Sequence, residues 1–383
     1  MNQITKRVVL HFPGFEPLDA QAHRARYERS AKQSAAVWNY NISTGELAET
    51  SGVRSFIVDA QGAGWRTQSS IHILDHDDLV RALRNKNFVL RLVHGYLNAA
   101  RVALDGGMAG YFRHAWRFGL FFIFPFLLMA VGLLISLSMA MLPYGLGLSA
   151  WHFLWSIPVA IAFFALIFLP LAERLHTLHL FADWELAVAF ARMDRAHFNQ
   201  WLERCTEAAR AAFAEEAEEY VISSHSMGSN VAAHVIGMLM EREPKLLNGK
   251  RVVFATLGGA ILQCALLRPA AVLRSRVGLI ARCKEIFWLD VHCLTDAIHF
   301  YKAPVVRLAG HADAPQANIV FIRIRHMLAS ERYRKIKRDF LRVHRQYVLG
   351  PDLRAPFDFT LLTAGPLPAA SFAKFSSANM PSL

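Results

Sequence analysis

Residues 220–234 read Tyr220-Val-Ile-Ser-Ser-His-Ser-Met-Gly-Ser-Asn-Val-Ala-Ala-His234. The apolar start of this stretch predicts a short strand, Ser224-His-Ser-Met-Gly228 predicts a tight turn, and the small residues that follow predict a helix. Such a turn forces its middle residue, Ser226, into strained backbone angles and lifts the hydroxyl above the edge of the sheet. The flanking residues must then be small, because strand and helix cross closely there. Gly228 meets this requirement.

Strand and helix patterns alternate along the rest of the chain, which is typical of an α/β domain. Strands are expected at 7–11, 54–59, 69–74, 220–223, 251–257, 286–291 and 319–324. Helices are expected at 17–32, 77–105, 180–218, 227–242, 259–267 and 331–347. Expected strands lie on both sides of an apolar insertion, so we expect one domain built from residues 1–112 and 177–350. Residues 351–383, rich in proline and small residues, predict a loop that wraps the surface or is loose.

The insertion, residues 113–176, contains the longest uncharged stretch. Positions 118 to 172 hold no Asp, Glu, Lys or Arg. A helix that crosses a bilayer needs roughly 20 apolar residues, so this stretch predicts a transmembrane helical hairpin with spans near 118–142 and 150–171. Basic residues flank the hairpin and its turn is uncharged, which places both long flanks in the cytoplasm by the positive-inside rule. The alternative is a hydrophobic hairpin buried in a soluble protein.

The composition excludes several classes of protein. The 383 residues include 42 Lys and Arg against 30 Asp and Glu, a net charge of +12, and 54% are hydrophobic. This is too apolar for a disordered chain. The four cysteines form no C-x-x-C pair, which argues against a disulfide framework, a zinc ribbon or an iron–sulfur site. There is no P-loop and no complete dinucleotide fingerprint. We therefore expect neither a metal nor a cofactor.

The strand, turn and helix around Ser226 form the arrangement called a nucleophile elbow. With it the chain resembles the α/β-hydrolase superfamily, and more closely the two-span bacterial membrane proteins of that type, although Ser224 stands where those proteins usually have glycine. The resemblance implies a mostly parallel sheet with helices on both faces and a location in the bacterial inner membrane. It also implies a serine nucleophile, an acid and a histidine in that sequence order, and an oxyanion hole.

Two carboxylates near the end of the strand at 286–291 are candidates for the acid. Asp290 lies within the strand, whereas Asp296 lies in the loop that follows it. In the hydrolase pattern the acid comes a few residues after the strand, so the resemblance favours Asp296. Asp290 remains the alternative, and it is otherwise expected to be a strand-end residue that hydrogen-bonds the loop.

Two histidines, His326 and His344, follow the last expected strand. His326 comes directly after the strand, where the topology favours it. Helical spacing favours His344, which shares one face with Tyr333, Ile336, Phe340 and Tyr347. The resemblance includes a His-x-Gln-Tyr segment, matched by His344-Arg-Gln-Tyr347, and a following Ala-Gly-Pro at 364–366. We favour His344 and keep His326 as the alternative.

The early segment Val8-Val-Leu-His-Phe-Pro-Gly-Phe-Glu16 predicts a strand that ends in a glycine-containing loop. It is similar to the His-Gly loop of hydrolases. The resemblance then assigns the oxyanion hole to the backbone amides of Phe15 and of Met227, the residue after Ser226. Losing one such donor typically costs about 3 to 4 kcal/mol of transition-state stabilisation. The alternative is an ordinary strand-to-helix turn.

Together these residues predict acyl transfer, in which His344 takes the proton of Ser226 and Asp296 holds the tautomer of the imidazole. We expect a serine hydrolase of the lipase or esterase type. Its substrate would be an acyl ester of a lipid or another amphiphile, because the hairpin holds the site near the bilayer. The alternative is a non-catalytic, membrane-anchored binding or scaffold protein with the same fold.

The helix expected at 331–347 is strongly basic over residues 331–345. Its basic residues are Arg332, Arg334, Lys335, Lys337, Arg338, Arg342 and Arg345. Anionic lipid is the expected partner, at about 1 kcal/mol for each basic side chain near the surface. A solvated face is the alternative, and without a recognised reader motif we expect no nucleic acid.

Overall fold

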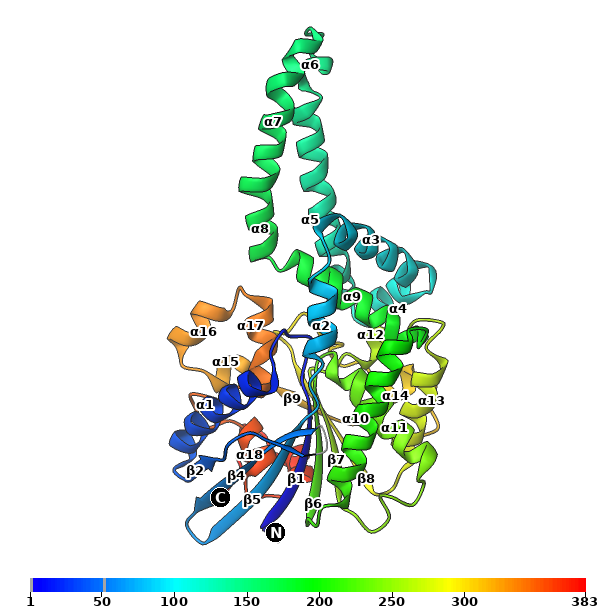
Figure 1. The fold of residues 1–383 in the computed structure, drawn as a ribbon. Helices are drawn as coiled ribbons and strands as arrows, with labels where there is room; N and C mark the ends of the chain where they lie inside the picture. Colours follow the sequence, from blue (N-terminus) through cyan, green and yellow to red (C-terminus); the bar gives the residue numbers. More distant parts are fainter. Residues whose placement is uncertain (1–2, 51–52) are drawn as a thin grey trace.

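The computed structural model describes residues 3–50 and 53–383. Within these residues, a mixed, mostly parallel sheet has nine strands in the order β2-β4-β5-β1-β6-β7-β8-β9, with β3 paired to β4 (Figure 1). The strands are β1 (Lys6–Phe12), β2 (Asn41–Thr44), β3 (Ala48–Thr50), β4 (Val53–Gly62), β5 (Trp65–Ile73), β6 (Glu219–His225), β7 (Val252–Leu257), β8 (Ile286–Cys293) and β9 (Asn318–Ile322). The run from β5 to β9 is parallel, whereas β2, β3 and β4 form an antiparallel edge.

All seven strands expected from the sequence are present, and the α/β class is confirmed. The two unexpected strands, β2 and β3, are short and lie at the antiparallel edge. A strand of three or four residues carries too few side chains for alternation to be detected, so pairing with β4 decides that these segments are extended.

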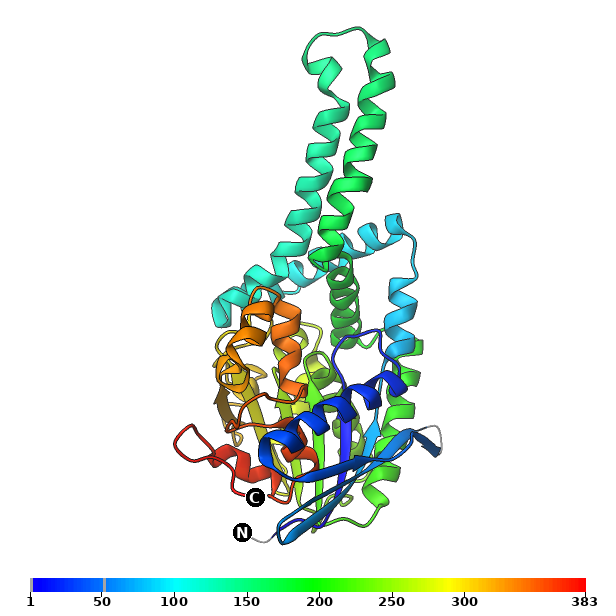
Figure 2. The same ribbon diagram turned by 90° about the vertical axis from the view of Figure 1, so that its left-hand side faces the viewer.

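Helices cover both faces of the sheet (Figures 1 and 2). Successive residues of β1 point to opposite faces, as in any strand. Val8, Leu10 and Phe12 join a core that includes residues of α10 (Ala196–Ala214), α11 (Gly228–Arg242) and α13 (Ala271–Arg282). Val9 joins the second core, with residues of α1 (Ala20–Trp38) and α18 (Phe359–Ala364). The central strands are therefore buried on both sides, which explains their continuous apolar runs.

Three long helices expected from periodicity are each divided in the structure. The segment 77–105 forms α2 (Asp77–Arg84) and α3 (Phe88–Leu104). The segment 180–218 forms α9 (Thr177–Arg192) and α10. The segment 331–347 forms α16 (Ser330–Ile336), α17 (Phe340–His344) and a 3-10 turn. Side-chain caps explain two of the breaks: Asn87 accepts the amide of Leu90 at 2.9 Å, and Asp339 accepts the amide of Arg342 at 3.0 Å. The remaining helices are α4 (Gly107–His114), α12 (Ile261–Ala265), α14 (Val305–Leu308) and α15 (Ile324–Met327).

The proline-rich segment 351–383, for which the sequence predicts a loop that wraps the surface or is loose, contains two helical segments. It forms α18 and the 3-10 helix η4 (Ala369–Lys374), and both pack into the second core. The guanidinium of Arg7, buried against Glu219 at 2.8 Å, donates to the carbonyls of Gly365 and Leu367, each at 2.8 Å. This buried ion pair needs those carbonyls, because an unsatisfied buried charge is costly.

The hairpin projects from the body of the protein (Figures 1 and 2). Its first arm is α5 (Trp116–Ala140), and its second arm is formed by α7 (Phe153–Phe163), the π-helical turn η2 (Phe164–Phe168) and α8 (Leu169–Arg174); the short α6 (Leu142–Gly145) lies at the tip. The two arms, Trp116–Ala140 and Ala150–Arg174, have mean hydropathies of 2.7 and 2.3 and are long and apolar enough to cross a membrane. Most of each arm is not buried by the protein, although side chains at the base of the first arm, such as Phe118 and Phe122, belong to the first core.

Candidate active site

The turn around Ser226 has the backbone expected of a strained elbow. β6 ends at His225, α11 begins at Gly228, and Ser226 between them has a φ of 53°. A positive φ is uncommon for a residue other than glycine and marks local strain. A Cβ on Gly228 would lie 2.3 Å from the carbonyl oxygens of Phe12 and Pro13, so only glycine fits there. Ser224 is accommodated because its buried hydroxyl donates to the carbonyl of Ala255 on β7, at 3.1 Å.

His344 and Asp296 are in direct contact. The Nδ1 atom of His344, at the end of α17, lies 2.8 Å from Oδ2 of Asp296, in the loop after β8. Because the carboxylate can only accept, Nδ1 carries the proton and Nε2 keeps a free lone pair. That Nε2 is buried and has no hydrogen-bond partner among the described residues. The pair therefore presents an oriented imidazole with an available basic nitrogen.

Asp296 is held as a carboxylate by its surroundings. Burial by itself would raise its pKa, but the imidazoles of His344 and His299 hold the pKa of Asp296 well below its usual range. Nδ1 of His299 lies 3.2 Å from Oδ2, and the amide of Ile298 donates to Oδ1 at 2.9 Å. These contacts fix the carboxylate in the loop and keep it charged.

The His344 ring lies beside the Ser226 turn. The rings of His344 and His225 have centroids 4.7 Å apart. On the other side, a Cβ on Gly258 would lie 3.1 Å from Cε1 of His344. Gly258 follows Leu257, whose carbonyl accepts the amide of Ser226 at 3.2 Å. The strained serine and the imidazole therefore share the same neighbours at the carboxyl ends of β6 and β7.

His225 connects the elbow to the helix that carries His344. Its Nε2 donates to the carbonyl oxygen of His344 at 3.0 Å. Burial, with a further contribution from His344, lowers the pKa of His225 to about 3, so the ring is neutral near pH 7. The sequence predicts only that His225 lies in the turn. It cannot predict the hydrogen bond to His344, because that residue is far away along the chain.

The alternative acid and base lie elsewhere. Asp290 accepts from Thr256 Oγ1 at 2.6 Å and contacts His292 Nε2 at 2.9 Å, in a buried network between β7 and β8 whose His292 ring lies 5.0 Å from the ring of His299. His326 is exposed on α15 and lines a groove with Pro356 and Phe357. The structure thus brings Asp296 and His344 into contact next to the turn that carries Ser226, and neither Asp290 nor His326 contacts His344. The single helical face used to favour His344 does not exist, since α16 and α17 are separate helices.

The loop after β1 reaches the same place. A Cβ on Gly14 would lie 3.2 Å from Cβ of Ser226, so this loop packs against the serine. Among the described residues, the amides of Phe15 and Met227 donate to no protein acceptor. The loop is held to α17's end by Glu16, whose carboxylate lies 2.6 Å from Nε of Arg345 and also pairs with Arg26.

Two polar residues of the surroundings were not singled out from the sequence. Asp183 on α9 accepts a hydrogen bond from Nε2 of Gln263 on α12, at 3.0 Å. Burial raises the pKa of Asp183 to about 6, although this hydrogen bond and the positive charge available on His344 oppose the shift. An acidic residue within the apolar helix Thr177–Arg192 could have drawn attention to Asp183 in the sequence. Periodicity alone, however, does not show which residues surround such a side chain.

The base of the hairpin packs on the segments that carry Asp296 and His344. Nη1 of Arg117 donates to the carbonyl of Leu294 at 2.7 Å. The rings of Phe118 and Phe300 have centroids 4.2 Å apart, and those of Phe121 and Phe340 are 5.8 Å apart. The first arm therefore contacts the acid loop on one side and α17 on the other.

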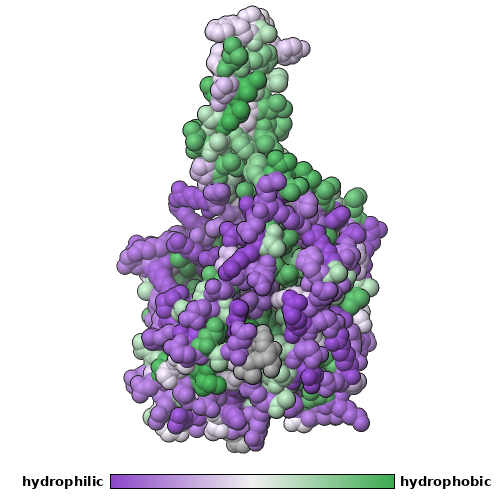
Figure 3. Space-filling view, in the orientation of Figure 1, coloured by the Kyte–Doolittle hydropathy of each residue, from purple (hydrophilic) through white to green (hydrophobic). Residues whose placement is uncertain are grey.

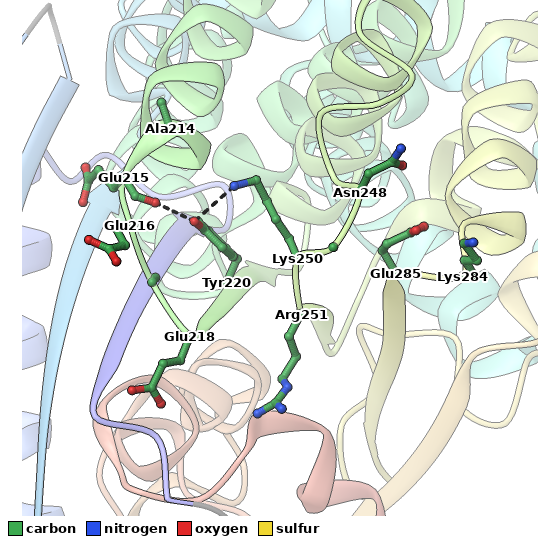
Figure 4. A pocket seen from close by; sticks show the side chains of 12 residues that line it. Ala214, Glu215, Glu216, Glu218, Tyr220, Asn248, Lys250, Arg251, Lys284 and Glu285 are labelled. Carbon is green, nitrogen blue, oxygen red and sulfur yellow. Dashed lines mark hydrogen bonds between the residues drawn. The ribbon is translucent and has the colours of Figure 1, made fainter.

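A cavity lined by polar and charged residues lies away from this cluster. It has a volume of 820 Å³ and is lined by charged residues of both signs near the amino ends of β6, β7 and β8, including Glu215, Lys250 and Glu285 (Figure 4). Tyr220 donates there to the carbonyl of Glu215 at 2.5 Å, and Lys250 donates to the Tyr220 hydroxyl at 3.3 Å. The candidate site lies instead at the carboxyl ends of the strands, where ligands of open α/β sheets usually bind.

In the part of the chain that the structure describes, no three His, Cys, Asp or Glu side chains are grouped to hold a metal ion. In comparisons with known proteins, no family model matches the chain, and neither a curated protein nor a solved structure matches it.

Proposed function

We propose that the protein is a serine hydrolase with an α/β-hydrolase fold that cleaves acyl esters. The 2.8 Å contact between His344 Nδ1 and Asp296 Oδ2, beside the strained Ser226, is the observation that carries the proposal. A buried imidazole that is oriented by a carboxylate and has a free second nitrogen is the general base that a serine nucleophile requires.

In the proposed reaction, Oγ of Ser226 attacks the ester carbonyl carbon while Nε2 of His344 takes the hydroxyl proton. The charge that develops on the carbonyl oxygen is stabilised by the amides of Phe15 and Met227. When the carbon–oxygen bond of the ester breaks, His344 returns the proton to the leaving alcohol. Water, activated by the same imidazole, then hydrolyses the acyl-enzyme and regenerates Ser226.

The proposed substrate is a lipid or another amphiphile that carries an acyl ester. The carboxyl ends of the parallel strands point toward the hairpin (Figure 1), and residues at its base pack on the segments of Asp296 and His344. We place the hairpin across the bacterial inner membrane, with the N- and C-terminal parts in the cytoplasm. Arg113 precedes the first arm, and Arg117 and Arg174 lie at the ends of the two arms next to the body, as the positive-inside rule requires.

Anionic lipid is the proposed partner of the basic segment 331–345. This segment lies at the end of the body that faces the hairpin (Figure 1). Several of its charges are paired locally, for example Arg332 with Asp352 at 2.8 Å and Lys335 with Glu331 at 2.7 Å. Membrane attraction would therefore come from the remaining cations of the segment.

An active-site-directed fluorophosphonate tests the proposal. The full chain in detergent should be labelled, and Ser226→Ala should not be. Ser275→Ala, which removes an exposed hydroxyl on α13, is the matched control and should label like the wild type. Thermal unfolding of each preparation shows that the protein is folded. If folded wild type is not labelled, the serine is not activated and a non-catalytic, membrane-anchored binding or scaffold protein is the better description.

A further inference from the structure

Helix α3 (Phe88–Leu104) has an uncovered apolar face. Its outward side chains are Val89, Leu90, Val93, Leu97 and Leu104, with exposed fractions of 64, 45, 48, 53 and 72%. At 100° per residue these positions fall within about 100° of one another around the helix axis. They form one continuous stripe, which we call the α3 apolar face. Large apolar patches left open to water usually mark an interaction site.

Two other positions of α3 fix the helix to the protein. A Cβ on Gly95 would lie 2.2 Å from the ring of Phe181 on α9, so the two helices are in close contact. The hydroxyl of Tyr96 donates to the carbonyl of Phe126 in the first arm of the hairpin, at 2.9 Å. α3 therefore holds a set orientation. At 100° per residue, Gly95 lies opposite the middle of the α3 apolar face, whereas Tyr96 lies about 20° from Val89, at the edge of that face.

The position of α3 links this face to the hairpin. α3 runs across the base of the projecting arms (Figures 1 and 2). In the space-filling view, the hydrophobic surface of the hairpin continues onto the adjoining shoulder of the body (Figure 3). The two apolar surfaces are therefore continuous.

The length of the hairpin indicates what covers the α3 apolar face. The part of α5 beyond the contact with Tyr96, residues 127–140, spans about 21 Å at 1.5 Å per residue. The hydrocarbon core of a bilayer is about 30 Å thick. A bilayer that the hairpin crosses must therefore extend past Phe126 toward the body, to the level at which α3 lies. The exposed cations Arg84, Arg101 and Arg113 lie in or next to α3 and α4, where they can meet lipid head groups.

We propose that α3 is an interfacial helix that lies in the plane of the membrane surface, with the α3 apolar face inserted into the lipid of the bilayer that holds the hairpin. The body of the protein is then attached by three helices rather than two. Its orientation is fixed, and the carboxyl ends of the strands face the membrane. This proposal does not require that the protein be an enzyme.

Depth-sensitive labelling of the full chain tests the proposal. Leu97→Cys is made in a Cys283→Ser background, since Cys283 is partly exposed and the other three cysteines are buried. Val272→Cys on α13, whose native side chain is 44% exposed, is the matched control. Each cysteine is labelled with the environment-sensitive dye NBD, and the protein is reconstituted into phosphatidylcholine vesicles that contain a minor share of phosphatidylglycerol.

We expect lipids that carry a nitroxide near the top of the acyl chain to quench the dye at position 97 several-fold more than the dye at position 272. Iodide in the water should show the reverse order. Val93→Cys, one turn away on the same face, should repeat the result at 97. Iodide quenching at 97 equal to that at 272 would show that the face is open to water and would overturn the proposal. Protection at 97 from both quenchers would show that a protein covers the face, such as a second copy of the chain, and would also overturn it.

Discussion

The imidazole of His225 donates through Nε2 to the backbone carbonyl of His344, at 3.0 Å. This single contact joins the residue before the strained serine to the residue that holds the carboxylate of Asp296. The elbow and α17 come from distant parts of the chain, and no strand or helix ladder connects them. His225 therefore ties the turn at Ser226 to the helix that carries His344.

His225→Ala should reduce the rate of fluorophosphonate labelling about 10-fold, because a buried hydrogen bond worth about 1 kcal/mol is lost and the helix that carries His344 is released. His225→Gln keeps an N–H donor and should recover part of the rate. Labelling time courses at fixed probe concentration measure both effects. A merely space-filling role predicts no difference between the Ala and Gln variants after correction for the folded fraction.

Asp296→Asn should lower turnover of a short-chain acyl ester by about 10⁴-fold, since the amide can turn its N–H₂ toward Nδ1 and favour the wrong tautomer of His344. The paired control is Asp290→Asn, a second buried acid whose partners are Thr256 and His292. Its turnover, compared at equal folded concentration, should stay within a few-fold of wild type. Equal losses in the two variants would mean that Asp296 has no special part in the reaction.

The buried carboxyl of Asp183 predicts a dependence of stability on pH. Its pKa is raised to about 6 by burial, above the ordinary value of about 3.9. As the pH rises from about 4 to about 6, the unfolded chain loses this proton first, so the free energy of unfolding should fall, by about 2 kcal/mol for this group. Asp183→Asn should remove that part of the fall.

The measurement is the midpoint of thermal unfolding of both proteins in detergent across this pH range. Asp75 also has a pKa raised to about 6 by burial and adds a slope of the same sign. The informative quantity is therefore the difference between wild type and Asp183→Asn. A difference that does not change with pH would rule out a raised pKa at Asp183.

Gly228→Ala should abolish labelling and lower the free energy of unfolding by about 2 kcal/mol or more, because the new methyl group would overlap the backbone oxygens of Phe12 and Pro13. Gly145→Ala, at the tip of the hairpin, meets nothing within 4 Å and is the control. Its free energy of unfolding should differ from that of wild type by less than about 0.5 kcal/mol. Full labelling of Gly228→Ala would show that an active Ser226 does not require the close approach of Gly228 to the backbone of Phe12 and Pro13.

Much of the architecture could be predicted from local patterns. Apolar runs predicted all seven of the longer strands, and the stretch without charged residues predicted both arms of the hairpin. The residues around Ser226 predicted a strained turn, which its φ of 53° confirms. Each of these features depends on side chains within one short segment, so their spacing carries the information.

Helix breaks and edge strands were harder to predict. Periodicity continues through 77–105 and 331–347, but Asn87 and Asp339 cap new helices inside these segments. The prolines of segment 351–383 predict a loop, yet two of its carbonyls accept hydrogen bonds from the buried Arg7. In each case a competing hydrogen bond decided the structure.

The sequence by itself determined the α/β class, the apolar hairpin and the strained turn, because backbone preference and hydrophobic spacing act between near neighbours. Only the tertiary structure decided that His344 meets Asp296, that His225 holds His344, and that the apolar face of α3 is left outward at the base of the hairpin. Those contacts join residues far apart in the chain, and their geometry depends on how the sheet orders its strands and how helices pack on it. Hydrogen bonding and burial between distant segments therefore joined Asp296 to His344, the pair that the sequence favours over Asp290 and His326.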